Sequence, residues 1–131
     1  MNKIKAQRIK IHQKWGGHCA YCGKLIAYKD MQIDHVSPLA YAPSPDDKNS
    51  AVHSFENLMP SCRRCNHYKR QCDLEGFRRL IKTLHERLQD QYNIKVAIDY
   101  GIVVIKPFNG IFYFEKFQRS TIKTLISESL F

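Results

Sequence analysis

The 131-residue sequence predicts a small α+β fold, and three observations support this class. Amphipathic stretches with the period of a helix alternate with short runs of β-branched residues. Two cysteine pairs, each with two residues between its members, can clamp distant segments together. A hydrophobic fraction of 44% allows one modest core, so we expect a single domain over residues 1–131. Its expected parts are an N-terminal helix with its turn (1–18), a cysteine-framed centre (19–72) and a C-terminal part (73–131).

The N-terminal half is expected to hold one helix, one strand and a long loop. An apolar stripe among many lysines predicts a basic helix over residues 3–15, which Gly16 and Gly17 end. Residues 31–36 have the composition of a short strand. Three prolines among small polar residues predict a loop over residues 38–50.

The C-terminal part is expected to contain a long helix followed by strands. Apolar residues recur at spacings of three and four after Asp73, so this helix is predicted to end near Tyr92. The β-branched runs 94–98 and 102–105, joined by a turn that contains Gly101, indicate a hairpin. The remaining expected elements are a third strand over 111–117 and a terminal helix over 121–130.

The charge balance favours a polyanionic partner. Twenty-one Lys and Arg residues against twelve Asp and Glu residues give a formal net charge of +9. Such cations displace condensed counterions from nucleic-acid phosphates, although solubility alone is the plainer explanation of the same excess. No apolar run has membrane-spanning length, and the N-terminus lacks the apolar core of a signal peptide, so the expected location is the cytoplasm.

The two cysteine pairs, Cys19-x-x-Cys22 and Cys62-x-x-Cys65, have the spacing of a structural zinc site. Zinc prefers four tetrahedral thiolates, and two intervening residues let both sulfurs of a pair reach one ion. The alternative of buried apolar cysteines or disulfides is disfavoured by the spacing and by a reducing cytosol. A redox-active pair would lack its usual βαβ context. Cys72 is expected to be a spare thiol.

A carboxylate, an imidazole and two carboxamides lie near this cysteine framework in the sequence. Asp34 and His35 are neighbours in the expected strand, whereas Asn57 precedes the second cysteine pair and Asn66 follows it directly. Carboxylate and carboxamide oxygens suit a hard dication such as Mg²⁺. An imidazole can take a proton from water near neutral pH. Together these groups have the chemistry to hydrolyse a phosphodiester.

In these residues the sequence resembles the HNH endonucleases, also called His-Me finger or ββα-metal nucleases. The resemblance covers roughly residues 15–70 and rests on Asp34-His35, Asn57-Leu58 and Cys62-x-x-Cys65-Asn66-x-x-Lys69, framed by Cys19-x-x-Cys22. It implies a zinc-stapled ββα-metal finger with flanking helices and a small C-terminal β-hairpin or sheet. The chain departs from the family pattern in the loop after the first strand, where prolines and Asp46-Asp47 replace a Gly-Gly pair.

The resemblance also implies how these residues would cleave a phosphodiester. His35 is the general base that activates water, and Asp34 and Asn66 bind one Mg²⁺ or Mn²⁺ ion that stabilises the departing 3′ oxygen. Asn57 holds the loop of the finger and so helps to orient His35. The expected products carry 5′-phosphate and 3′-hydroxyl ends. For Asn66, a plain helix N-cap is the simpler alternative role.

Basic residues around the second cysteine pair are expected to contact the nucleic acid, with a solvated basic face as the alternative. These residues are Arg63, Arg64, Lys69 and Arg70. His67 follows Asn66 on a helix and so points about 100° away from it, which leaves it a phosphate contact at best. His53, in the loop, is expected to be solvated.

The leading interpretation is therefore a DNA endonuclease that nicks one strand or cuts both. A zinc-stapled nucleic-acid-binding module without cleavage is one alternative, but it would not need Asp34, His35 and Asn66. RNA cleavage is the other alternative. The expected partner is double-stranded DNA, with a monomer and a homodimer both left open. Similarity of residues 74–78 and 113–116 to small bacteriophage HNH proteins indicates a bacterial host cell.

Overall fold

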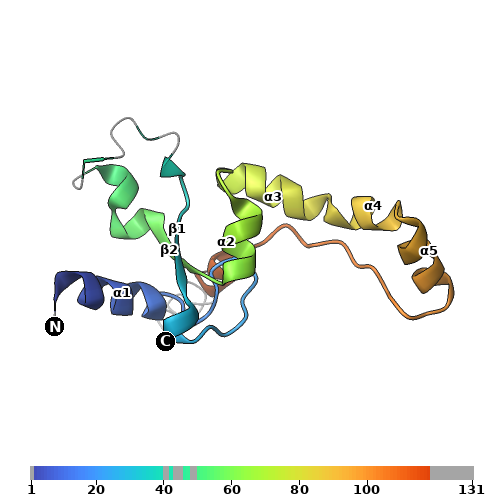
Figure 1. Ribbon diagram of the computed structural model, residues 1–131, viewed down its shortest axis with the longest axis horizontal. Coiled ribbons are helices and arrows are strands. Elements are labelled where there is room, and N and C mark those ends of the chain that lie inside the picture. The colour runs from blue at the N-terminus through green and yellow to red at the C-terminus, as the bar shows by residue number, and fades with distance from the viewer. Residues whose placement is uncertain (1, 40–41, 43–45, 48–49, 119–131) are drawn as a thin grey trace, which may run out of the picture. The chain divides into compact units, whose positions relative to one another are not determined.

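The computed structural model describes residues 2–39, 42, 46–47 and 50–118. Its helices and its two-stranded antiparallel sheet confirm the α+β class (Figure 1). The chain divides into two compact units, one containing the residues up to Asp73 together with those from Phe112 onward, and the other Leu74–Ile111. A single domain over residues 1–131 stays a prediction.

Helix α1 (Lys3–Gln13) belongs to the first unit and confirms the expected basic helix. Asn2 caps its start, because the side-chain oxygen accepts a hydrogen bond from a backbone amide of the first turn at 2.8 Å. The helix ends before Gly16 and Gly17, whose φ angles of +66° and +83° lie in the left-handed region that glycine tolerates. Ile11, in the last turn, is completely buried and anchors the helix to the core.

The sheet consists of strands β1 (Gln32–His35) and β2 (Leu58–Ser61), which pair antiparallel with Asp34 opposite Met59. Helix α2 (Arg63–Lys69) follows β2 and lies beside the strands in Figure 1. The order β1–β2–α2 is the ββα finger that the resemblance implied. Short 3-10 helices occupy the connections: η1 (Tyr28–Asp30), η3 (Ala51–His53) and η4 (Phe55–Asn57).

Aromatic side chains form the centre of the first unit. The Tyr21 and Phe112 rings meet edge to face with centroids 5.4 Å apart, and the Trp15 and Phe114 centroids are 5.9 Å apart. All four side chains are buried. Aromatic pairs at these separations contribute beyond their buried area, so this cluster joins the end of the described chain to its beginning.

Residues 113–118 are helical, so the expected third strand over 111–117 is wrong. The Phe112 amide donates a hydrogen bond to the Glu115 carboxylate at 2.9 Å, which is one half of a capping box. The next two amides donate to backbone carbonyls in the loop of the first cysteine pair. The alternation of aromatic residues resembled a strand, but Phe112 and Phe114 are buried at the start of a helix instead.

The second unit contains three helices, α3 (Leu74–Lys82), α4 (Leu84–Gln89) and α5 (Tyr92–Asp99) (Figure 1). The helix expected from Asp73 to near Tyr92 is therefore interrupted at Thr83. The hydroxyl of Thr83 donates to the Arg79 carbonyl at 2.9 Å, and the Thr83 amide donates to the same carbonyl at 3.1 Å. Such a side-chain bond to the preceding turn often bends a helix.

Helix α5 also shows that the expected hairpin over residues 94–105 is wrong. Gly101 has a φ of +71°, and its amide donates to the Ile98 carbonyl at 3.0 Å. The Ile102 amide donates to the Ala97 carbonyl at 2.9 Å. This pair of bonds is a Schellman motif, so the glycine that suggested a hairpin turn ends a helix instead. Residues 102–105 form no strand.

Two further expectations concern the loop and the C-terminus. The loop expected over residues 38–50 is described only in part, and the expected terminal helix over 121–130 lies outside the described residues. Among the helices that the structure does describe, none combines the length and the apolar character needed to cross a bilayer.

Candidate active site and metal centre

The four paired cysteines come together in the first unit. The sulfur atoms of Cys19, Cys22, Cys62 and Cys65 all lie within 4.8 Å of one another. The Cys62 sulfur accepts a hydrogen bond from the Cys65 amide at 3.4 Å, so the second pair has the backbone support expected of a metal-binding turn. Cys72 is not part of this cluster.

The chemistry of this cluster fits a soft or borderline dication. Hydrogen bonds from Cys22 and Cys65 lower the pKa of the Cys19 thiol, whereas the same crowding, chiefly the contact with Cys19, raises the pKa of Cys65. Four thiolates this close repel one another unless a cation lies between them. Four sulfur ligands in one cluster are the donor set that zinc prefers.

A glycine shapes the turn of the first cysteine pair. Gly23 follows Cys22 with a φ of +84°, and its amide donates to the Cys19 carbonyl at 3.0 Å. A β-carbon at Gly23 would come within 2.7 Å of the Tyr113 ring. Both its backbone angle and this close approach therefore require glycine here.

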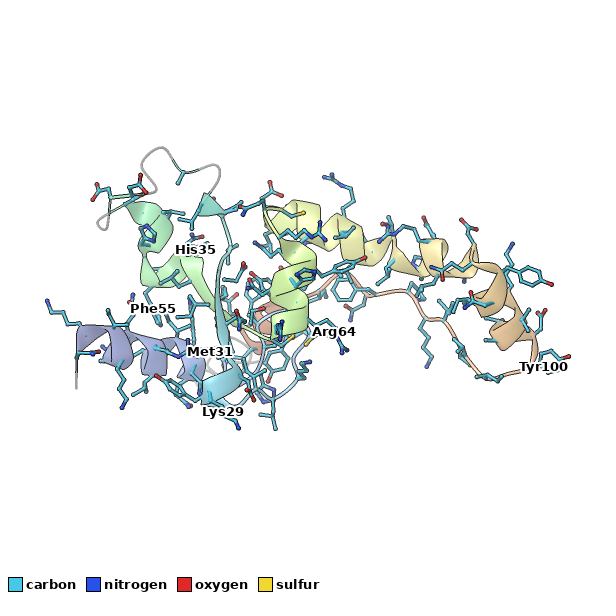
Figure 2. The ribbon with its side chains drawn as sticks, viewed as in Figure 1. Lys29, Met31, His35, Phe55, Arg64 and Tyr100 are labelled. Atoms are coloured by element: carbon cyan, nitrogen blue, oxygen red, sulfur yellow. The ribbon has the colours of Figure 1, made fainter. Side chains whose placement is uncertain are left out.

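A second cluster lies at the other end of the finger, in a pocket of about 240 Å³. We call it the His35 pocket. Asp34 and His35 reach it from β1, and Asn66 and Arg70 reach it from α2 and the residue that follows. Figure 2 shows His35 at the end of β1 opposite to Met31. The fold thus brings together three of the residues singled out in the sequence and one of the expected phosphate contacts.

Asp34 is buried and held by two partners through one carboxylate oxygen. The Tyr21 hydroxyl donates a hydrogen bond to Oδ2, and the Lys69 ammonium lies 3.1 Å from the same oxygen. The carboxylate therefore keeps a fixed orientation, and Oδ1 remains as the oxygen that could meet a cation.

Lys69 does not lie where the sequence placed it. Its side chain is 0% exposed, and its ammonium also donates to the His35 carbonyl at 3.0 Å. A wholly buried ammonium paired with a carboxylate does not reach a phosphate outside the protein, so the expected nucleic-acid contact is replaced by a structural one. The sequence did not indicate this burial, because a lysine at the end of a short helix is usually exposed.

Tyr21 is a further site residue that the sequence did not single out. Burial first, and then the adjacent Asp34 carboxylate, raise the pKa of Tyr21 above its usual range, so the phenol stays a hydrogen-bond donor. Because Tyr21 lies between Cys19 and Cys22, it links the cysteine cluster directly to Asp34. Its position between the first two cysteines was the one feature of the sequence that could have indicated a role near the site.

His35 is half-buried, and its Nε2 lies 3.4 Å from Nδ1 of His53. The two rings meet edge to face with centroids 5.4 Å apart. Burial, and then the charge of His53, lower the pKa of His35 despite the opposing effect of Asp34. His53 was expected to be solvated, but it is half-buried against the candidate base.

Asn57 spans the loop between the two strands. Its amide nitrogen donates to the carbonyls of Val52 at 2.7 Å and Ser37 at 3.1 Å, and its oxygen accepts from the Ser37 amide at 2.8 Å. These bonds join the segment after β1 to the segment before β2. They are the contacts that the expected loop-holding role requires, although the effect on His35 stays a prediction.

The three remaining expected phosphate contacts lie on two sides of α2. Arg70 lines the His35 pocket with a φ of +51°, an uncommon backbone conformation for a residue other than glycine. Arg63 and Arg64 are exposed and line a different pocket, of about 860 Å³, together with His67. Asn66 and His67 thus face different pockets, as their helical spacing indicated.

The geometry can be compared with known proteins. An HNH endonuclease family model matches residues 19–71. The CRISPR-associated endonuclease Cas9 of Corynebacterium diphtheriae is 34% identical over 62 residues, which make up 47% of this chain and 5% of that protein. The crystal structure of the type II-C Cas9 enzyme from Actinomyces naeslundii matches with a TM-score of 0.49 and 21% identity, over 76% of this chain and 10% of that one.

The chain thus spans a small fraction of the length of both similar proteins. The family match begins at Cys19, the first cysteine of the cluster, and ends just after Arg70. It therefore contains the whole cysteine cluster and the residues of the His35 pocket. The similarity to the HNH endonuclease family is therefore found over residues 19–71, which the family model matches.

Proposed function

We propose that this chain is a metal-dependent endonuclease that hydrolyses phosphodiester bonds of double-stranded DNA in the His35 pocket. The observation that carries the proposal is the convergence of Asp34, His35 and Asn66 on one pocket, from two elements of the finger. A nucleic-acid-binding module has no use for a half-buried imidazole beside a fixed carboxylate. The family match supports the same chemistry.

His35 acts as the general base of this reaction. Its lowered pKa keeps the imidazole neutral near physiological pH, so one ring nitrogen can accept a proton from the attacking water. The contact with His53 involves Nε2, which leaves Nδ1 for the water. Lys69 restrains the backbone of His35 through the carbonyl oxygen.

Asp34 and Asn66 hold the divalent cation, Mg²⁺ or Mn²⁺. A carboxylate oxygen and a carboxamide oxygen are hard donors of the kind these ions prefer, and Asp34 is already oriented by Tyr21 and Lys69. When bound, the cation supplies Lewis-acid stabilisation of the phosphate and of the departing 3′ oxygen. Arg70, at the edge of the same pocket, holds the scissile phosphate, and the products carry 5′-phosphate and 3′-hydroxyl ends.

The cysteine cluster holds one structural zinc ion through Cys19, Cys22, Cys62 and Cys65. This ion fixes the start of α2, and therefore Asn66, relative to the loop that carries Tyr21. The site requires reduced thiols, and none of the five cysteines forms a disulfide. We infer that the chain works in a reducing compartment such as the cytoplasm of a bacterial host cell.

Cleavage of supercoiled plasmid DNA in Mg²⁺ or Mn²⁺ tests the proposal. We expect the wild-type chain to convert the plasmid to nicked or linear DNA. Replacing the general base, His35→Ala, is expected to slow the reaction by about 100-fold or more, because general-base catalysis typically contributes that much. His85→Ala is the matched control, since His85 lies on α4 and lines neither the His35 pocket nor the pocket of Arg63 and Arg64.

Two outcomes separate this proposal from its alternatives. A wild-type chain that binds DNA and never cuts it, with either ion, would show a binding module instead. Cleavage of RNA in place of DNA under the same conditions would keep the catalytic assignment and replace the substrate. Equal losses in His35→Ala and His85→Ala would remove His35 from its proposed role.

A further inference from the structure

The larger pocket beside α2 concentrates positive charge. Its wall comes from two segments, residues 24–32 and the outer side of α2, and it measures about 860 Å³. The charged and titratable residues in this wall are Lys24, Lys29, Asp30, Arg63, Arg64 and His67. All of them are exposed. We call this region the basic pocket.

The four cations of the basic pocket are free to meet a partner. Within the described part of the chain, Lys24, Lys29, Arg63 and Arg64 form no ion pair, and Asp30 is the single acid of the pocket wall. Other cations of the first unit have structural partners, as Lys69 does with Asp34. Four unpaired cations around one cavity repel one another, and a polyanion relieves that repulsion.

The basic pocket and the His35 pocket share no wall residue, yet both border α2. Figure 2 places Lys29 and Arg64 toward one end of the finger and His35 toward the other. Both pockets border one helix, and an α-helix with its side chains is about 10–12 Å across, so a single nucleic-acid strand can reach from one pocket to the other. One DNA strand rises about 3.4 Å per nucleotide, so the width of one helix corresponds to about three nucleotides.

The size of the basic pocket favours an extended ligand over a single phosphate group. Its volume is more than three times that of the His35 pocket, and its cations come from two separate segments of the chain. A lone phosphate ion would engage only part of this wall. A sugar-phosphate backbone presents one charge per nucleotide and can meet all four cations in turn.

We propose that the basic pocket is a second DNA-binding surface, which holds the substrate backbone a few nucleotides away from the phosphate cut in the His35 pocket. This inference rests on the proposed function for the identity of the ligand. It adds Lys24 and Lys29, which lie in neither the catalytic motif nor the cysteine cluster, to the residues that recognise the substrate.

The salt dependence of DNA binding tests this surface. Binding of a fluorescent DNA duplex is measured by anisotropy between about 50 and 200 mM salt, in a His35→Ala background so that bound DNA is not cut. The test variant is Lys24→Gln with Lys29→Gln. The matched control is Lys95→Gln with Lys106→Gln, which removes the same charge from exposed positions of the second unit.

Each lost phosphate contact lowers the slope of log Kd against log salt by about 0.9, so the pocket variant is expected to lower it by about 1–2. At about 0.1 M salt, its Kd should rise about tenfold or more. The control variant should leave the slope nearly unchanged. Equal effects of the two variants, no effect of the pocket variant, or no DNA binding by the parent would overturn the inference.

Cleavage is measured separately so that the two proposals fail in different ways. Wild-type cleavage combined with unaltered binding by the pocket variant overturns the surface and leaves the endonuclease assignment intact. Weakened binding by the pocket variant, in a chain whose wild type never cleaves, sustains the surface and overturns the assignment.

Discussion

Lys69 contacts both of the adjacent residues to which we assign the chemistry. Its ammonium lies 3.1 Å from the Asp34 carboxylate and donates to the His35 carbonyl at 3.0 Å, with no exposed side-chain surface. A buried carboxylate without its cation keeps the full cost of its lost hydration. Lys69 therefore stabilises the folded chain and positions the His35 pocket at the same time.

Substitution of this lysine, Lys69→Met, is expected to lower the free energy of unfolding by about 3–5 kcal/mol, because it leaves the buried Asp34 carboxylate without its cation. Urea unfolding followed by the fluorescence of Trp15 measures the change. The control Lys116→Met removes an exposed lysine of the same unit and should change stability by no more than about 0.5 kcal/mol. Equal stabilities of the two variants would contradict the structural role of Lys69.

The environment of His35 predicts the pH dependence of cleavage. Burial, followed by the charge of His53, holds the pKa of His35 below its ordinary value of 6.5. The neutral, proton-accepting form therefore persists as the pH falls through 6.5. Single-turnover cleavage rates are expected to stay high at that pH and to decline only at lower values.

The variant His53→Gln removes the second cause of this lowered pKa but not the first. The acidic limb of the pH–rate profile is therefore expected to move to higher pH, toward the ordinary value for histidine. His67→Gln, on the far side of α2, should leave the limb in place. A limb that stays put or moves to lower pH in His53→Gln would contradict the account of the His35–His53 contact.

The residues to which we assign catalysis could be singled out in the sequence, but the residues that support them could not. Asp34, His35 and Asn66 stand in a motif with fixed spacing, and the structure gathers them in one pocket. Tyr21 and Lys69 support Asp34 only because three segments far apart in the chain meet there. Burial of this kind depends on tertiary packing, which residue spacing does not encode.

At the scale of elements, the segments tied to the cysteine cluster were predictable and the C-terminal elements were not. Strand β1, strand β2 and helix α2 follow the motif closely. In α5, by contrast, β-branched residues at alternate positions resembled a strand, and Gly101 suits a hairpin turn as well as a helix end. Only the hydrogen bonds of the Schellman motif distinguish a helix end from a hairpin turn here, and the order of residue types does not reveal those bonds.

The zinc ion is expected to decide whether the finger folds. A structural zinc site contributes on the order of 10 kcal/mol or more, which is comparable with the whole stability of a domain. Cys65→Ser should therefore lower bound zinc well below one ion per chain and abolish cooperative thermal unfolding of the finger. Cys72→Ser, which changes the cysteine outside the cluster, should keep both. Elemental analysis and circular dichroism measure the two effects, and full zinc binding by Cys65→Ser would exclude the four-cysteine site.

At the scale of the whole molecule, the net charge of +9 predicts the class of partner but not the residues that meet it. Arg8 donates to two backbone carbonyls, and Lys14 donates to the carbonyls of Phe55 at 2.7 Å and Leu58 at 2.9 Å. Burial lowers the pKa of Lys14. These cations hold the fold together, whereas the basic pocket keeps its four cations exposed.

The central claim is that one pocket of this chain hydrolyses DNA with His35 as base. Its most direct test is the single-turnover cleavage of an end-labelled DNA duplex in Mg²⁺, with the product ends analysed for wild type and His35→Ala. We predict 5′-phosphate and 3′-hydroxyl ends from the wild type. The cleavage rate of the variant should be lower by about 100-fold or more. A His35→Ala chain that cuts at the wild-type rate, or a wild type that leaves the duplex intact in both Mg²⁺ and Mn²⁺, would contradict the claim.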